Sequence, residues 1–381
     1  MMQLLFWISA LLLLYIYLGY PLLLRFLPRS KPAPVPAGAE EIYPSVTVII
    51  PAYNEADHIE ATVTNKLAQD YPADKLQIIV VSDESEDDTD EIVQRIAEQH
   101  PNVQLLRQVP RQGKTAGLNL AMQQVSSEIV VFSDANSHYA PDAIKQLTQC
   151  FNDQSIGYVT GKMVYTNSDG SLVGDGCSAY MKYENHLRSL ETHTGSVVGV
   201  DGGIDAIRTE LYQPMNADQL PDFVLPLKVV SQGKRVGYCP EALLNEEALN
   251  SADSEFRMRV RVSLRAYWAL WDMRHLFNPK RFGIFSLQLV SHKLLRYLAF
   301  LPLIVAFITA ALLSGQSLFY SAAFFGQLAF YVAAVYAGTT GSSNRWLGLA
   351  NYFCLINFAA MLAFINFVKG EKIVIWKPRV G

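Results

Sequence analysis

The 381-residue sequence predicts an α/β fold in which a doubly wound sheet is joined to membrane-spanning helices. Two patterns predict this class. Short aliphatic runs alternate with helical stretches of ten or more residues, which is typical of βαβ units and a largely parallel sheet. Long uncharged stretches lie on either side of this region, and a membrane-spanning helix needs roughly 20 apolar residues. Half of all residues are hydrophobic, more than a purely soluble protein of this size usually contains.

Four strands and three helices are expected in the first part of the polar region. The strands are β-branched or aliphatic runs at 46–54, 76–83, 103–107 and 128–134. The helices between them show apolar residues at helical spacing, at 58–69, 89–99 and 115–125. Parallel strands that are buried on both faces form continuous apolar runs, as these do. Their carboxyl ends should meet at one edge of the sheet, where ligands bind in such proteins.

The second part of the polar region, about 157–250, is less regular. We expect a helix in Y-M-K-Y-E-N-H-L-R-S-L-E-T, a glycine-rich loop with a strand in V-V-G-V-D-G-G-I-D-A-I-R, and a loop leading into a helix in P-D-F-V-L-P-L-K-V-V. Residues 255–296 then combine arginines at a spacing of four with apolar and aromatic residues. This pattern favours amphipathic helices at the membrane surface, with an ordinary surface helix as the alternative.

The uncharged stretches at 1–24, 297–344 and 346–368 are long enough for one, two and one membrane-spanning helices. The first lacks the basic start and the cleavage pattern of a signal peptide, so residues 1–25 are expected to form an uncleaved anchor. Residues 26–44 are rich in proline and should be an extended linker. Membrane helices are expected within 297–368.

Positive charge flanks the polar middle of the chain on both sides, which places that middle in the cytoplasm. The tail at 369–381 also carries four basic residues, yet four spans would place it outside. Either one C-terminal hydrophobic segment is re-entrant or the charge rule fails here, and both alternatives remain open.

Polar side chains follow three of the four predicted strands, in P-A-Y-N-E, S-D-E-S-E-D-D-T and S-D-A-N-S. Mg²⁺ and Mn²⁺ prefer oxygen ligands and bind through one or two carboxylates together with phosphate oxygens. Asp134 and Asn136 supply such oxygens, and Gly113-Lys114 begins a helix where backbone amides and a lysine favour phosphate. The sequence therefore predicts a site for a metal-bound nucleotide diphosphate. The competing interpretation is a turn in which Asp and Asn bond their own backbone.

In their order and spacing, V-T-V-I-I-P-A-Y-N-E, V-V-S-D-E-S-E-D-D-T, G-K-T-A-G-L-N-L-A and F-S-D-A-N-S resemble the donor-binding half of family-2 inverting glycosyltransferases of the GT-A fold. The resemblance covers about residues 45–265, and the placement of the membrane segments is similar to that of membrane-bound bacterial members. It implies a mixed sheet, a nucleotide-sugar donor and Mg²⁺ or Mn²⁺. A catalytic domain would then occupy 45–254, on the cytoplasmic side of a bacterial inner membrane.

The resemblance also implies roles for individual residues at the strand ends. Pro51, Tyr53 and Glu55 would line the nucleotide pocket, and Asp83 would hydrogen-bond the base, commonly uracil. Glu84 replaces the glycine that usually follows this aspartate.

Asp134 and Asn136 stand at the D-x-D motif, which holds the metal and the ribose. The second Asp of that motif is usually the direct metal ligand. Here it is Asn, a neutral oxygen donor.

Inverting transfer needs one general base that removes the proton of the acceptor hydroxyl. The resemblance implies that this base is Asp222 in L-P-D-F-V-L-P-L, although an aspartate here is also typical of a helix N-cap. Asp201 in V-G-V-D-G-G could compete for the role, and its glycines suggest a tight turn near the acceptor. Arg259 and Arg261 stand at the Q-R-x-R-W motif of processive synthases and would contact diphosphate. Because the Gln and Trp of that motif are missing, transfer of one sugar per encounter is favoured.

The predicted function is therefore that of a membrane-anchored inverting glycosyltransferase, which transfers a sugar from a UDP-linked donor to a lipid-linked or membrane-held glycan acceptor. Such an enzyme would serve cell-surface polysaccharide or glycolipid synthesis. Two alternatives stay open: transfer to polyprenyl phosphate, and a non-catalytic membrane scaffold with a degenerate sugar-nucleotide module. A net charge of -4 gives no indication of a nucleic-acid partner, and nothing in the sequence indicates an oligomeric state.

Overall fold

The computed structural model of the protein describes residues 1–28, 43–166, 172–247, 252–342 and 344–373. Most of the predicted linker and most of the predicted tail lie outside the described residues. An eight-stranded mixed sheet, in the order β3-β2-β1-β4-β7-β6-β8-β5, forms the centre of residues 43–247, which we call the sheet domain.

The first four strands pair in parallel, as the sequence predicts. They are β1 (Val46–Ala52), β2 (Leu76–Ser82), β3 (Val103–Arg107) and β4 (Ile129–Phe132). The other strands are β5 (His138–Tyr139), β6 (Ile156–Thr166), β7 (Asp205–Arg208) and β8 (Arg235–Glu247). Strand β7 runs antiparallel to both β4 and β6, so the sheet changes direction beside the carboxyl end of β4.

Helices cover both faces of the sheet because its central strands are apolar on both sides. In β1, Val48 and Ile50 belong to one buried cluster and Ile49 to the other. The predicted helices are present as α3 (Ile59–Leu67), α4 (Thr89–Gln99) and α5 (Lys114–Met122), and α6 (Ala143–Gln149) follows. Short 3₁₀ turns lie at Ala73–Lys75, Cys150–Asn152, Thr209–Leu211 and Arg274–Phe277.

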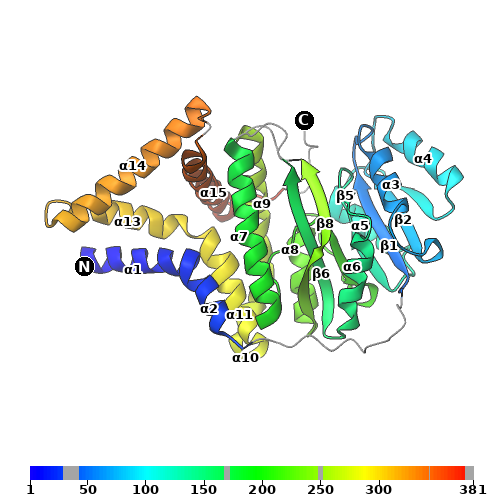
Figure 1. Ribbon diagram of the computed structural model, residues 1–381, viewed down its shortest axis with the longest axis horizontal. Coiled ribbons are helices and arrows are strands. Elements are labelled where there is room, and N and C mark those ends of the chain that lie inside the picture. The colour runs from blue at the N-terminus through cyan, green and yellow to red at the C-terminus, as the bar shows by residue number, and fades with distance from the viewer. Residues whose placement is uncertain (29–42, 167–171, 248–251, 343, 374–381) are drawn as a thin grey trace.

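Three more helices follow: α7 (Leu172–Thr194), α8 (Pro221–Ser231) and α9 (Ala252–Asp272). Helices α7 and α9 stand between the sheet and the apolar helices (Figure 1). The apolar side of α9 packs against α15 (Arg345–Val368) through Leu264, Tyr267 and Ala363. Arg265 is buried, and it donates to the carbonyl oxygens of Asp218 and Gln219 in the sheet domain.

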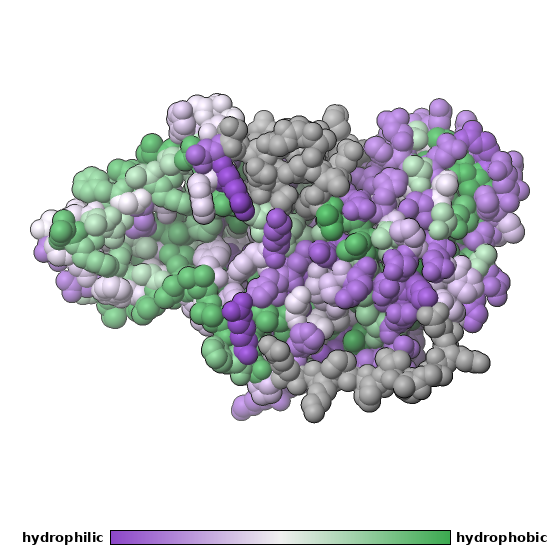
Figure 2. All heavy atoms as spheres, in the orientation of Figure 1, coloured by the Kyte–Doolittle hydropathy of each residue, from purple (hydrophilic) through white to green (hydrophobic). Residues whose placement is uncertain are grey.

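Three described helices are long and apolar enough to cross a membrane. The first runs from α1 (Met2–Leu14) through a π-helical stretch (Tyr15–Gly19) into α2 (Tyr20–Phe26). The others are α14 (Leu318–Thr340) and α15. Hydrophobic residues gather around α1, α13 (Phe300–Leu313) and α14, whereas hydrophilic residues cover much of the sheet domain (Figure 2).

A fourth apolar segment is bent by 57° between residues 284–297 and α13, so it forms either a broken span or a re-entrant loop. We call residues 284–297 the membrane-linked segment; a short helix, α10 (Pro279–Phe282), precedes it. The segment consists of α11 (Ile284–Leu289), a π-helical turn (Val290–Leu294) and α12 (Leu295–Tyr297).

The chain that follows α15 returns to the sheet domain and to α9. Trp268 Nε1 donates to the carbonyl oxygen of Glu371 at 2.8 Å, and Lys372 Nζ lies 2.5 Å from Asp218 Oδ2. The described start of the tail therefore lies beside the sheet domain. The charge rule predicts this location for its basic residues, whereas a count of four spans does not.

Candidate active site

One lysine joins two of the predicted site residues at the carboxyl edge of the parallel strands. Lys114 Nζ donates to Asp134 Oδ1 at 2.7 Å and lies 3.6 Å from Asp222 Oδ1. Asp134 follows β4, Lys114 is the first residue of α5, and Asp222 lies in the first turn of α8. Residues more than 100 positions apart are thus brought together by the ends of a strand and two helices.

The two carboxylates set the charge state of Lys114. Burial works to lower the pKa of its ammonium, but the attraction of Asp134 and Asp222 outweighs burial, and the pKa is raised. Lys114 is therefore charged at neutral pH. Two carboxylates share this one cation, so the three groups carry a net negative charge that an added cation would offset.

A glycine pair lets a loop pass close to both carboxylates. Gly202 has φ of +79°, and a Cβ there would come within 2.5 Å of the Asp222 carboxyl group. A Cβ on Gly203 would contact Asp134 Oδ2 at 3.6 Å. Position 202 thus needs glycine both for its backbone conformation and for the space that Asp222 occupies.

Asp205, which the sequence does not single out, fixes this loop through a hydrogen bond. Its side chain is buried, and Oδ2 accepts the backbone N–H of Gly202 at 2.9 Å. Burial raises the pKa of Asp205 to about 8, and the nearby charges of Asp222 and Asp201 add to the effect. The only signal in the sequence is an acidic residue at the start of a short strand, before two apolar residues.

Asp83 lies at the end of β2, and its carboxylate binds groups of the protein itself. Its carboxylate accepts the backbone N–H groups of Gln112 at 2.9 Å and Gly113 at 3.0 Å, and Arg111 Nε lies 3.4 Å away. It thereby fixes the loop that begins α5 and positions Lys114. The guanidinium of Arg111 also lies 3.3 Å from the ring centroid of Tyr53. Arg111 therefore joins two predicted nucleotide-binding residues, which the sequence analysis did not foresee.

The glycine missing after Asp83 has a structural explanation. Glu84 has φ of +60°, a conformation that glycine adopts more easily than other residues. Its Oε2 atom accepts the backbone N–H of Arg111 at 2.8 Å. This hydrogen bond offsets part of the free-energy cost of the positive φ. Nearby, Pro51 is half-buried in β1, and the backbone N–H of Glu55 donates to Thr89 Oγ1 at 2.8 Å.

The oxygen donors at this edge fit a divalent metal bound together with phosphate. Within the described residues, no three His, Cys, Asp or Glu side chains gather into a metal site. The carboxylate of Asp134 and the half-buried amide of Asn136 stand one residue apart. One carboxylate plus substrate phosphates is a usual way for Mg²⁺ to be held. Asp134 and Asn136 therefore stay the predicted ligands of such an ion.

The remaining predicted residues have partners elsewhere. Asp201 forms an ion pair of 2.5 Å with Arg188 on α7, and both side chains are only 4% exposed. Arg259 contacts Glu255 and the hydroxyl of Tyr352, each at 2.7 Å, and so faces α15. Arg261 is half-buried on the same helix. Their roles toward an acceptor or diphosphate stay predictions.

Comparison with known proteins identifies the family. Residues 44–269, more than half of the chain, match the family model described as glycosyltransferase like family 2. The chain belongs to this family, which confirms the predicted class of enzyme and its α/β fold.

Two curated relatives are similar over part of their length. One is the poly-beta-1,6-N-acetyl-D-glucosamine synthase of Staphylococcus aureus, 26% identical over 249 residues, which cover 64% of this chain and 60% of that protein. The other is glycosyltransferase AglE of Haloferax volcanii, 28% identical over 132 residues, or 35% of this chain and 43% of that protein. The similarity thus spans about half the length of these relatives.

A solved structure shares the fold along nearly the whole chain. The mannosyltransferase PcManGT from Pyrobaculum calidifontis, solved with GDP-Man and Mn²⁺, superimposes with a TM-score of 0.72 at 24% identity. The match covers 96% of this chain and 99% of that one, so it includes the apolar helices as well as the sheet domain.

Proposed function

We propose that this protein is a membrane-anchored inverting glycosyltransferase that transfers one sugar at a time from a nucleotide-diphospho-sugar to a lipid-linked or membrane-held glycan acceptor. The contact of one ammonium with both Asp134 and Asp222 carries the proposal. It brings a residue suited to the donor diphosphate next to a residue suited to the acceptor proton. Membership of the family and the three apolar helices support the same assignment.

Asp222 acts as the general base in this proposal. The Asp222 carboxylate lies 3.6 Å from the ammonium of Lys114, so its oxygens remain able to accept a proton from an acceptor hydroxyl. Gly202 keeps the surrounding backbone clear of this carboxylate.

Lys114 and the backbone N–H groups at the start of α5 attract the donor diphosphate. A bound Mg²⁺ or Mn²⁺, held by Asp134 and Asn136, would supply further positive charge to the departing diphosphate. Arg111 and Tyr53 lie where the nucleotide is expected. We assign UDP as the carrier, and because PcManGT was solved with GDP-Man, GDP-sugars belong in any donor screen.

The proposed location is a bacterial inner membrane, with the sheet domain on the cytoplasmic side. Basic residues lie on both sides of the sheet domain in the sequence, next to the apolar helices. This distribution agrees with the charge rule for a cytoplasmic segment. The membrane-linked segment and α15 would then hold the site beside a lipid-held acceptor.

Sugar incorporation tests this proposal. The full chain in detergent is given labelled UDP- or GDP-sugars with Mn²⁺ or Mg²⁺, with and without a lipid extract. We expect metal-dependent incorporation that needs the extract. Equal activity on soluble acceptors would remove the role of the membrane, and donor binding without turnover would favour a non-catalytic scaffold.

A further inference from the structure

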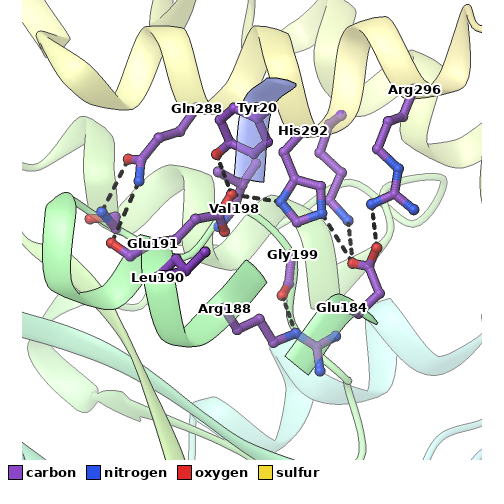
Figure 3. Close-up of polar contacts among 12 residues, drawn as sticks. Tyr20, Glu184, Arg188, Leu190, Glu191, Val198, Gly199, Gln288, His292 and Arg296 are labelled. Carbon is purple, nitrogen blue, oxygen red and sulfur yellow. Dashed lines mark hydrogen bonds and ion pairs between the residues drawn. The ribbon is translucent and has the colours of Figure 1, made fainter. Parts of the chain in front are cut away.

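A buried charged cluster connects the membrane-linked segment to α7 (Figure 3). Glu191 Oε1 accepts the hydroxyl of Tyr20 at 2.6 Å and contacts His292 Nδ1 at 2.7 Å. Its Oε2 atom accepts the backbone N–H of Val198 at 3.1 Å. One carboxylate thus connects the N-terminal apolar helix, the membrane-linked segment and the loop that leads to Gly202.

The second carboxylate of the cluster, Glu184, already has close partners on both oxygens. Its Oε2 atom lies 3.1 Å from His292 Nε2, and Oε1 accepts from Arg296 Nη1. The Glu184 side chain is buried. Burial works to raise its pKa, but the positive charges of Arg296 and its neighbours outweigh this, so the pKa is lowered and the group is ionised.

Lys293 is the member of the cluster with hydrogen-bonding capacity left over. Its closest carboxylate oxygen, Glu184 Oε2, is 3.9 Å away, which is too far for a hydrogen bond. Among the described residues no hydrogen bond to its ammonium is found, although the side chain is only 15% exposed. Lys293 is half-buried, and an ammonium has three donors. These donors are therefore available to a ligand.

The ammonium of Lys293 lies on the border of the candidate site. A Cβ on Gly199 would collide with its Nζ atom, and the ring centroid of Phe223 is 5.9 Å from the same atom. Phe223 directly follows Asp222, and Gly199 lies three residues before Gly202. Lys293 therefore lies beside the loop that leads to Gly202 and beside the first turn of α8, which carries Asp222.

From this geometry we propose that Lys293 binds a phosphate group of a membrane-held acceptor and so positions that acceptor at Asp222. The inference rests on the proposed function and narrows its acceptor to an anionic lipid. The phosphate is either the linking group of a lipid-diphosphate glycan, which keeps the proposed glycan acceptor, or that of a lipid monophosphate, which accepts the sugar itself and would take the place of the glycan. The donor diphosphate is assigned to the opposite side, at Lys114 and Asp134.

Binding of short isoprenoid phosphates tests this site. The full chain in neutral detergent is titrated with farnesyl phosphate, farnesyl diphosphate and uncharged farnesol, with thermal stability as the readout. We expect saturable stabilisation by at least one phosphate and none by farnesol. Lys293→Met should weaken the phosphate affinity at least about tenfold, as the loss of one charge-assisted hydrogen bond implies, and Lys293→Arg should retain most of it.

The control is Lys280→Met, which removes an exposed positive charge shortly before the membrane-linked segment and should leave affinity unchanged. A preference for farnesyl phosphate identifies a lipid monophosphate, and a preference for the diphosphate identifies the linking group. Equal affinity of wild type and Lys293→Met, equal loss in Lys280→Met, or stabilisation by farnesol would overturn the inference. If Lys293→Met does not fold, Lys293→Gln takes its place with the same expectations.

Nucleotide release from the donor, measured on the same preparations without lipid, separates this inference from the proposed function. Release by wild type, combined with unaltered phosphate binding in Lys293→Met, rejects only the phosphate site. Absence of release from any UDP- or GDP-sugar rejects the proposed function even if farnesyl phosphate binds.

Discussion

The ammonium of Lys114 lies 3.6 Å from Asp222, within ion-pair distance but beyond the usual length of a hydrogen bond. Its shorter contact, of 2.7 Å, goes to Asp134. The hydrogen bond of Lys114 therefore goes to Asp134, on the proposed donor side of the site. Asp222 retains the capacity to accept a proton. The two sides of the proposed reaction meet at this one side chain.

Asp222→Asn should lower transfer to a hydroxyl acceptor at least about a hundredfold, because general bases contribute by that order or more. Thermal stability and donor affinity should change little. Asp218→Asn, which removes a carboxylate four residues earlier, is the control and should keep its activity. Activity largely retained in Asp222→Asn would contradict the role as base and favour a phosphate acceptor.

Gly202→Ala should abolish turnover, because its Cβ would meet the Asp222 carboxyl group at 2.5 Å. Gly233 offers a matched control, since its φ of +81° is similar and a Cβ there meets nothing within 4 Å. Each substitution should cost about 1–2 kcal/mol of stability for the left-handed backbone. Turnover measured on both variants separates the clash with Asp222 from backbone strain. Equal loss of activity in the two variants would show that strain alone is responsible.

Asp205 should make the protein less stable as the pH rises. Its folded pKa of about 8 lies above the ordinary value near 4, so the folded state binds the extra proton between these values. The contribution of Asp205 to stability is thus greatest at low pH and is lost as the pH rises through about 8. Relative to wild type, Asp205→Asn should gain at least about 1.4 kcal/mol more at pH 8 than at pH 5, the equivalent of one pKa unit.

Denaturant unfolding of the full chain at the two pH values measures this gain. Asp153→Asn serves as the control: burial works to raise the pKa of Asp153, but its bonds with Ser155 lower it, so its effect should be the same at pH 5 and pH 8. A gain for Asp205→Asn that does not depend on pH would contradict the raised pKa.

The start of the tail should lie on the same side of the membrane as the sheet domain. Labelling with a membrane-impermeant maleimide in sealed vesicles tests this, in a background where the four native cysteines are replaced. Glu371→Cys should react from the same side as Glu91→Cys in the sheet domain, because Trp268 and Asp218 hold the tail there. Reaction of Glu371→Cys from the opposite side would favour four full spans.

The parallel half of the sheet could be predicted from sequence because buried strands and amphipathic helices leave strong local patterns. Strands β6 and β8 were not predicted, since their position depends on pairing with each other and with distant segments. The same holds for the long helix α9: its spacing indicates an amphipathic helix, but only the fold shows that α15 covers its apolar side.

Asp134, Lys114 and Asp222 could each be identified from motifs, yet their common contact required the structure. The environments of Asp205 and Lys293 could not be recognised from neighbouring residues in the sequence. The first gains its character from complete burial next to other carboxylates, and the second from the already occupied oxygens of Glu184. Such properties arise from packing between segments far apart in the chain.

Donor binding to an Asp134→Ala variant tests the central assignment most directly. Calorimetric titration of wild type with the active nucleotide-sugar, with and without Mn²⁺, should show binding that the metal strengthens. In Asp134→Ala the metal should no longer strengthen binding, while the variant keeps its fold and thermal stability. An Asp134→Ala variant that binds the donor as tightly as wild type, with the same response to Mn²⁺, would contradict the proposed site.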